Sequence, residues 1–198
     1  MKIVGICGGS GSGKGTVSTH LLSLGYPVID TDKIYHDLIS HETECLRDIR
    51  AEFGDSVVSS GRLDRRALAK VVFSGDNSSL ALKRLNSITH HYVLDEVRSQ
   101  ISHFCKLGAD LVFVDVPLLF ESGFDKECDV TVSVLSDREI RIMRICRRDG
   151  IDRAEAERRI DSQLPDSILS EKTDFSLCNN GAPDDLRDQI NELIKNIR

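Results

Sequence analysis

Short apolar runs alternate with longer segments of helical periodicity along this chain. Each run is rich in Val, Ile, Leu or Phe and has the length of a buried strand. The runs occupy residues 3–7, 26–30, 111–116 and 130–135, with a short fifth candidate at 175–178. Because strands that alternate with helices form parallel sheets, the pattern predicts an α/β fold with five parallel strands covered by helices on both faces.

The segments between these runs carry the pattern of amphipathic helices. Helices are expected over residues 14–24, 86–105, 137–148, 153–163 and 183–197. The stretch between the second and third strands contains no convincing strand, and turn signals at 59–61 and 75–77 divide it. The pattern therefore predicts a helical insertion between these two strands.

Size and composition are those of an ordinary globular protein. The chain has 198 residues, 40% of them hydrophobic, which suits one core domain with insertions. The formal net charge of −6 gives no general attraction for nucleic acid or for an anionic membrane surface. No apolar run approaches the roughly 20 residues that span a bilayer. Any phosphate must therefore be bound by a local site, and small-molecule partners are expected.

The six cysteines are widely spaced and form no C-x-x-C pair. This spacing excludes the common zinc patterns. The apolar run at residues 3–7 is also too short for the core of a signal peptide. Reduced thiols in the cytoplasm are therefore expected.

A glycine-rich loop follows the first strand. Residues 8–14 read Gly-Gly-Ser-Gly-Ser-Gly-Lys and fit the first seven positions of G-x-x-x-x-G-K-[ST], the P-loop. Glycines let successive N–H groups point at a polyphosphate, the following helix adds the partial positive charge of its N-terminus, and Lys14 supplies a mobile cation. The loop predicts binding of ATP with Mg²⁺. The residues expected to contact the nucleotide are Gly9, Ser10, Gly11, Ser12, Gly13, Lys14, Gly15 and Thr16.

One position of the loop departs from this motif. Gly15 occupies the Ser/Thr position, and the hydroxyl follows at Thr16, as in the Gly-Lys-Gly-Thr loop of adenylate kinases. Either Thr16 reaches Mg²⁺, or water completes more of the metal's ligand shell.

Three carboxylates lie near strand ends, where ligands bind in open α/β sheets. If the second strand persists to Asp32, then Asp30 and Asp32 share one face and can both point at the site. A carboxylate there can orient a hydroxyl acceptor and take its proton, and helix capping is the alternative role. Asp115, near the end of the third strand, is a candidate Mg²⁺ ligand through water.

Three arginines recur on the helix expected at 137–148. Arg141, Arg144 and Arg148 fall within an arc of roughly 60°, which predicts one exposed basic stripe. Such a stripe can cover bound phosphates as a lid does. The alternative is a solvated face paired with neighbouring acids.

Together, these segments resemble the dephospho-coenzyme A kinase family along nearly the whole chain. The most specific matches are Val-Ile-Asp-Thr-Asp at 28–32, Pro-Leu-Leu-Phe-Glu at 117–121 and Asn-Asn-Gly at 179–181. The resemblance implies transfer of the γ-phosphate of ATP to the ribose 3′-hydroxyl of dephospho-CoA, the last step of coenzyme A biosynthesis. It also implies three parts of the fold. These are a P-loop NTPase core over 1–30, 108–148 and 171–198, a helical substrate-binding insertion over 31–107 and a small helical lid over 149–170.

The resemblance further implies roles for single residues. Asp32 would orient or deprotonate the 3′-hydroxyl, and Arg144 and Arg148 would contact phosphates from the lid side. Asn180 and Gly181 would lie near the adenine of ATP. Arg141 is a further candidate contact to ATP. The residues expected on the substrate side are Asp32, His90, Pro117, Leu118 and Leu119.

Other kinds of nucleotide-binding protein share parts of this pattern. Uridine kinases have a similar loop, and shikimate kinases have an acid pair after the second strand. The glycine triplet of shikimate kinases and the D-G-x-P-R segment of adenylate kinases do not occur here. A nucleotide-dependent switch protein would need N-K-x-D for guanine, which is also absent.

Overall fold

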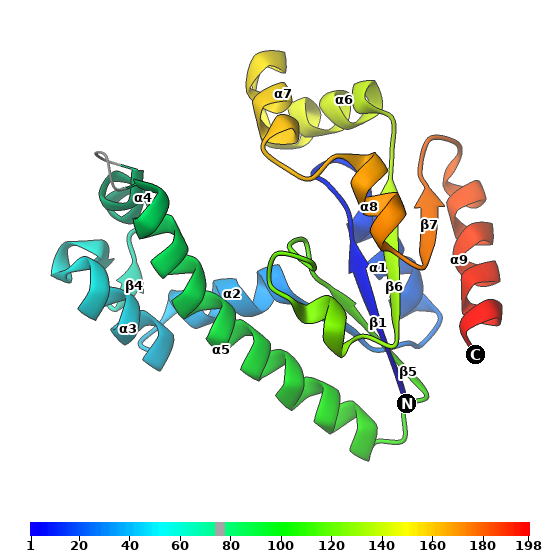
Figure 1. The fold of residues 1–198 in the computed structure, drawn as a ribbon, viewed down its shortest axis with the longest axis horizontal. Helices are drawn as coiled ribbons and strands as arrows, with labels where there is room; N and C mark the ends of the chain where they lie inside the picture. The colour runs from blue at the N-terminus through cyan, green and yellow to red at the C-terminus, as the bar shows by residue number, and fades with distance from the viewer. Residues whose placement is uncertain (74–77) are drawn as a thin grey trace. The chain divides into compact units, whose positions relative to one another are not determined.

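The computed structural model describes residues 1–73 and 78–198. Within them the chain forms two compact units (Figure 1). The first contains residues 1–29 and 103–198, and the second contains residues 30–102. No helix in the described part of the chain is both long and apolar enough to cross a membrane.

A five-stranded sheet, in the order β2-β5-β1-β6-β7, organises the first unit. Its strands are β1 (Lys2–Cys7), β2 (Val28–Asp30), β5 (Leu111–Asp115), β6 (Val130–Leu135) and β7 (Phe175–Cys178). β1 pairs in parallel with both β5 and β6, and β6 pairs in parallel with β7. The predicted α/β fold with a five-stranded parallel sheet is confirmed.

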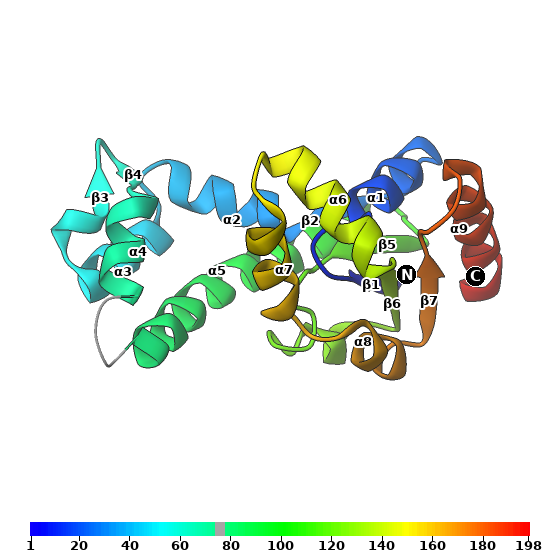
Figure 2. The same cartoon turned by 90° about the horizontal axis from the view of Figure 1, so that it is seen from above.

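Helices lie against both faces of this sheet, and in Figure 2 α1 and α8 are on opposite sides of the strands. The helices of this unit are α1 (Lys14–Ser23), α6 (Arg138–Asp149), α7 (Arg153–Asp161), α8 (Asp166–Lys172) and α9 (Pro183–Ile197), with the 3₁₀ turn η2 at Phe124–Glu127. Successive side chains of β1 point to opposite faces of the sheet and therefore pack in two different environments. Val4 and Ile6 join the core formed with α1 and α9, whereas Gly5 faces Leu119 and Cys128.

The second unit is mainly helical. Its elements are α2 (Thr31–Ser40), α3 (Glu44–Phe53), η1 (Asp55–Val57), β3 (Val58–Ser59), β4 (Arg62–Leu63), α4 (Arg65–Phe73) and α5 (Ser78–Lys106), whose last turn belongs to the first unit. They enclose a separate core. It contains Ile39, Cys45, Ile49, Val57, Leu68 and Val72. This core lets the insertion fold around its own apolar centre.

Some elements differ from the sequence-based expectation. The short antiparallel pair β3–β4 lies in the region expected to lack strands. The helix α5 begins at Ser78, well before the expected start at 86, and the seven-residue helix α8 was not expected at all. The predicted turn at 75–77 lies outside the described residues.

Candidate active site

The glycine-rich loop joins the carboxyl end of β1 to the first turn of α1. Gly11 and Gly13 have φ angles of 79° and 103°, a region that favours glycine. The amide of Thr16 donates to the carbonyl of Gly13 at 2.9 Å, so the helix starts directly at the loop. The amides of Lys14 and Gly15 belong to this first turn and have no acceptor within the helix. They are therefore placed to bind an anion, with the helix dipole in support.

Charged side chains gather at the carboxyl end of β1. The Nζ of Lys14 donates to the carbonyl of Gly8 at 2.7 Å. Burial raises the pKa of the Cys7 thiol to about 12, and the nearby carboxylates of Glu121 and Asp115 add to that rise while Lys14 opposes it. Cys7 is therefore a neutral thiol surrounded by a lysine and two acids, the charges expected around a bound phosphate and a cation.

Asp115 and Thr16 are the two residues that could hold a magnesium ion. Asp115 ends β5 with a buried side chain, and its Oδ2 accepts a hydrogen bond from the Ser18 hydroxyl at 3.2 Å. Thr16 is exposed on α1. Among the described residues, no group of three or more His, Cys, Asp or Glu could hold a metal. Mg²⁺ commonly uses one or two protein oxygens plus water and substrate phosphates, and the Asp115 carboxylate and the Thr16 hydroxyl are oxygen donors.

Side chains from α6 and from the segment after β7 bind carbonyl groups of the loop. Arg141 donates from Nε to the carbonyl of Ser10 at 2.9 Å. Asn179 donates to the carbonyl of Ser12 at 2.7 Å, and its backbone carbonyl accepts from Arg144 at 3.0 Å. In a trans peptide the N–H points away from the carbonyl, so the N–H groups of Gly11 and Gly13 point away from these side chains and can face a phosphate.

The three arginines of α6 have different environments, so the predicted single exposed stripe is wrong. Arg141 is only 4% exposed, and Arg144 is half-buried. Arg148 is exposed and forms an ion pair with Asp149 at 2.7 Å, to which Arg159 also binds. The hydrogen bond from Arg148 is the main cause that lowers the pKa of Asp149 to about 2, and the charge of Arg148 and the contact with Arg159 lower it further.

The segment after β7 is tied to the start of α6. Asn180 donates from Nδ2 to Oδ1 of Asp137 at 2.8 Å, and its Oδ1 accepts from the Asp137 amide at 2.8 Å. Gly181 packs so closely on Asp185 that a Cβ there would overlap the carboxylate. Asn180 also lines a cavity of about 560 Å³, a volume typical of ligand sites. The rest of its lining comes from the ends of β6 and β7, from Arg138 and Arg141 of α6, and from residues within 160–166, from the end of α7 to the start of α8.

On the second unit, the expected strand does not continue to Asp32. The helix α2 begins at Thr31, and Asp30 caps it by accepting a hydrogen bond from the Lys33 amide at 3.0 Å. Asp30 therefore has the capping role that was the alternative, and the expectation that both acids share a strand face is wrong. Asp32 lies in the first turn of α2. His90 lies half-buried within α5.

The segment after β5 is divided between surface and core. Pro117 is half-buried, and Leu118 is 44% exposed. Leu119 is wholly buried, and a Cβ at Gly5 would lie 3.1 Å from it. The side chain of Leu119 therefore belongs to the core and not to a surface open to substrate.

Comparisons with known proteins agree with this architecture. A family model described as dephospho-CoA kinase matches residues 2–185. A dephospho-CoA kinase of Fusobacterium nucleatum is 37% identical over 198 residues, with coverage of 100% of this chain and 99% of the relative. The solved structure of a dephospho-CoA kinase from Campylobacter jejuni is 27% identical, with a TM-score of 0.71 and coverage of 98% and 96%. The crystal structure of TT1252 from Thermus thermophilus is 35% identical, with a TM-score of 0.82 and coverage of 100% and 98%. Because the family match extends over nearly the whole chain, this protein belongs to the dephospho-CoA kinase family.

Proposed function

We propose that this protein transfers the γ-phosphate of ATP to the ribose 3′-hydroxyl of dephospho-CoA and so produces coenzyme A. Family membership supports the two substrates and the reaction. The observation that carries the proposal is the glycine-rich loop, whose helix-start amides and Lys14 can bind a polyphosphate while its carbonyls are bound from behind.

The loop is proposed to supply most of the catalytic stabilisation. Phosphoryl transfer demands positioning and neutralisation of charge more than covalent chemistry from the protein. The amides of Gly13, Lys14 and Gly15 would bind phosphate oxygens, and the ammonium of Lys14 would exchange the Gly8 carbonyl for an oxygen of the β- or γ-phosphate.

Asp32 is proposed to receive the proton of the attacking hydroxyl or to orient that hydroxyl. The side chain lies in the first turn of α2, directly after the capping residue Asp30. A carboxylate that accepts the hydroxyl proton leaves the acceptor oxygen with an electron pair to form the new bond to phosphorus. We propose that His90, Pro117 and Leu118 contact the same substrate.

Mg²⁺ is proposed as the cofactor, held by Asp115 and Thr16 partly through water. When bound, this ion neutralises negative charge on the phosphates. Asn180 and Gly181 are proposed to lie near the adenine. Residues 149–170 are proposed as a lid. Arg144 and Arg148, on the helix α6 that leads into it, are proposed to contact the phosphates from the lid side.

The setting proposed for this reaction is the cytoplasm, with free small molecules as the only substrates. The formal net charge of −6 disfavours nucleic acid and anionic membranes as partners. Every cysteine in the chain is unpaired, including the exposed Cys105 and Cys178, which suits a reducing compartment.

A substrate panel tests the proposal. Purified protein is incubated with ATP, Mg²⁺ and either dephospho-CoA, uridine, shikimate or AMP, and ADP release and product mass are followed. We expect one phosphate to be added to dephospho-CoA alone, at the 3′ position by phosphorus NMR. Transfer to another acceptor would contradict the proposed substrate, and ADP release without phosphorylated product would contradict a kinase.

A further inference from the structure

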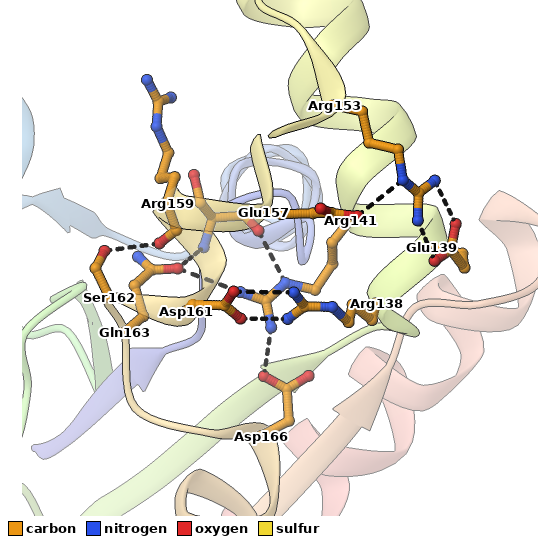
Figure 3. A network of polar contacts seen from close by, with 11 residues as sticks. Arg138, Glu139, Arg141, Arg153, Glu157, Arg159, Asp161, Ser162, Gln163 and Asp166 are labelled. Atoms are coloured by element: carbon orange, nitrogen blue, oxygen red, sulfur yellow. Dashed lines mark hydrogen bonds and ion pairs between the residues drawn. The ribbon is translucent and has the colours of Figure 1, made fainter. Parts of the chain in front are cut away.

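Both backbone polar groups of Ser10 are hydrogen-bonded to side chains distant in sequence. The Ser10 amide donates to Oε1 of Gln163 at 2.8 Å, and the Ser10 carbonyl accepts from Nε of Arg141 at 2.9 Å. The two side chains also contact each other, because Arg141 donates to the same Oε1 at 3.2 Å (Figure 3). Asp166 completes the set by accepting from the remaining nitrogen of Arg141 at 2.7 Å.

This set of contacts leaves Arg141 little freedom. All three guanidinium nitrogens have partners, and the side chain is buried. Gly9 is part of the fit, since a Cβ at that position would overlap the guanidinium. Removing Asp166 would leave a buried positive charge without its counter-ion, which is a strongly unfavourable arrangement.

Neighbouring ion pairs provide a contrast. Arg153 and Glu139 form a two-bond pair whose side chains are 58% and 69% exposed, and Figure 3 shows it near Arg141. Exposed pairs of this kind contribute little to the free energy of unfolding. Neither member of this pair is hydrogen-bonded to the glycine-rich loop, and neither lines the cavity beside Asn180. The two pairs are thus similar in chemistry but differ in their connection to the loop.

We infer that Arg141, Gln163 and Asp166 are positioning residues that fix the Ser10 peptide and thereby hold the loop in its phosphate-binding conformation. The inference rests on the proposed function, because it assumes that the loop binds ATP. A loop held in the bound conformation does not have to be ordered when the nucleotide arrives, so this preorganisation adds to the affinity for ATP. The amides of Gly13, Lys14 and Gly15, which belong to the same loop, would then be in place to stabilise charge during transfer.

These three residues connect the glycine-rich loop to helices that are distant in sequence. Gln163 lies between α7 and α8, and Asp166 is the first residue of α8. Arg141 lies on α6. The conformation of the glycine-rich loop is thereby tied to the segment between α7 and α8, which carries no phosphate-binding motif of its own.

The test compares matched substitutions through ATP affinity measured without an acceptor. In Gln163→Leu the acceptor oxygen is lost, whereas in Gln163→Glu it is kept. We expect Gln163→Leu and Asp166→Ala to raise the Kd for ATP–Mg²⁺, measured by calorimetry, on the order of tenfold. A change of that size corresponds to the loss of one hydrogen bond to a charged or structured group. The Kd of Gln163→Glu for ATP–Mg²⁺ should stay within about threefold of that of the original protein, because the acceptor oxygen is kept. The exposed-pair control Glu139→Ala should bind ATP as the original protein does.

Two further readouts separate positioning from simple loss of stability. The Ser10 amide should exchange its hydrogen faster in Gln163→Leu, because its acceptor is gone. In variants that keep a normal Tm, KM for ATP should rise while KM for dephospho-CoA stays unchanged. Equal ATP affinity in Gln163→Leu and the original protein, or equal loss in Glu139→Ala and Asp166→Ala, would overturn the inference. Because binding is measured without acceptor, transfer to a molecule other than dephospho-CoA would refute the proposed function and leave this result intact.

Discussion

Glycines in the glycine-rich loop allow neighbouring side chains to pack closely against the loop, in addition to leaving room for a ligand. At Gly13 the left-handed backbone and the close approach of Asn179 both exclude a side chain, because a Cβ would overlap the amide nitrogen of Asn179. Gly15 is different, since a Cβ there has no atom within 4 Å and its φ is not left-handed. The two positions therefore make a matched pair for substitution.

Gly13→Ala should lower the free energy of unfolding by about 1–3 kcal/mol, because it strains the backbone and displaces Asn179. It should also weaken ATP binding, since the amides around Gly13 would shift. Thermal unfolding and calorimetry measure the two effects. Gly15→Ala is the control for stability, and helix propensity predicts no loss, or a gain of up to about 1 kcal/mol. Equal destabilisation by both substitutions would contradict this view of the loop.

Asp32→Asn should lower kcat by about 10²–10⁴, the usual contribution of general base catalysis, while KM for ATP changes little. Steady-state assays with each substrate varied in turn give both numbers. Asp30→Asn is the matched control, because Asn caps helices as well as Asp and preserves the start of α2. Near-normal kcat in Asp32→Asn would refute the proposed role.

Alkylation should distinguish the cysteines. Burial raises the pKa of Cys7 and Cys128 to about 12 and that of Cys45 to about 11, so at pH 8 these thiols remain protonated and unreactive. Cys105 and Cys178 are exposed. Brief treatment of the native protein with iodoacetamide, followed by peptide mass spectrometry, should therefore modify Cys105 and Cys178 first. Early modification of Cys7 would contradict the described burial.

Elements with a strong repeating pattern were the ones predicted best. The strands Val130–Leu135 and Phe175–Cys178 and the helix Pro183–Ile197 have the predicted bounds. The first strand is rich in Val, the second alternates Phe and Leu with small residues, and the helix has a complete amphipathic stripe, which explains this success. The strands β3 and β4 have two residues each and α8 has seven, too few for a period to be read from sequence.

Only those parts of the site that form a continuous motif could be predicted from the sequence. The glycine-rich loop and Lys14 form one continuous motif, so their position could be read directly from sequence. The partners of Ser10 could not, because Gln163 is more than 150 residues away along the chain and meets the loop only through tertiary packing. The buried position of Arg141 escaped for the same reason, since helical spacing does not reveal that Asp166 lies opposite it.

The ends of α6 and α7 are joined by Asp149, which binds both Arg148 and Arg159. The pKa of Asp149, lowered to about 2, means that its charge stabilises the fold above the unfolded-state pKa of about 3.9. That contribution is lost as pH falls from about 4 through 2. The Tm difference between the original protein and Asp149→Asn should be small but constant from pH 7 to 5 and should disappear near pH 2. A difference that grows on acidification would contradict this assignment.

At the scale of the whole molecule, two compact units divide the proposed work. The first carries the loop, and the second has its own core around Ile49 and Val57. Nucleotide and acceptor are therefore expected to stabilise different parts of the chain. Each ligand binds the folded state alone, so its effect follows from mass action.

ATP–Mg²⁺ at 100 times its Kd should raise the free energy of unfolding by about 2.7 kcal/mol. Hydrogen exchange should show that this protection is concentrated in residues 8–16, with little change in α3 and α4. Adding dephospho-CoA, or the product, should then protect α2 and the middle of α5. Equal protection of both units by ATP alone would contradict the proposed division.

The close fit of Gly9 against Arg141 also limits how the loop can be reused. A designer who grafts these seven residues onto another nucleotide-binding scaffold would copy the motif without the arginine, glutamine and aspartate that maintain its shape. Conversely, a bulkier residue at position 9 becomes compatible with the fold only if residue 141 is shortened in the same protein. A graft that keeps the conformation of the loop therefore has to include three separate segments: the loop, the face of α6 that carries Arg141, and the turn between α7 and α8.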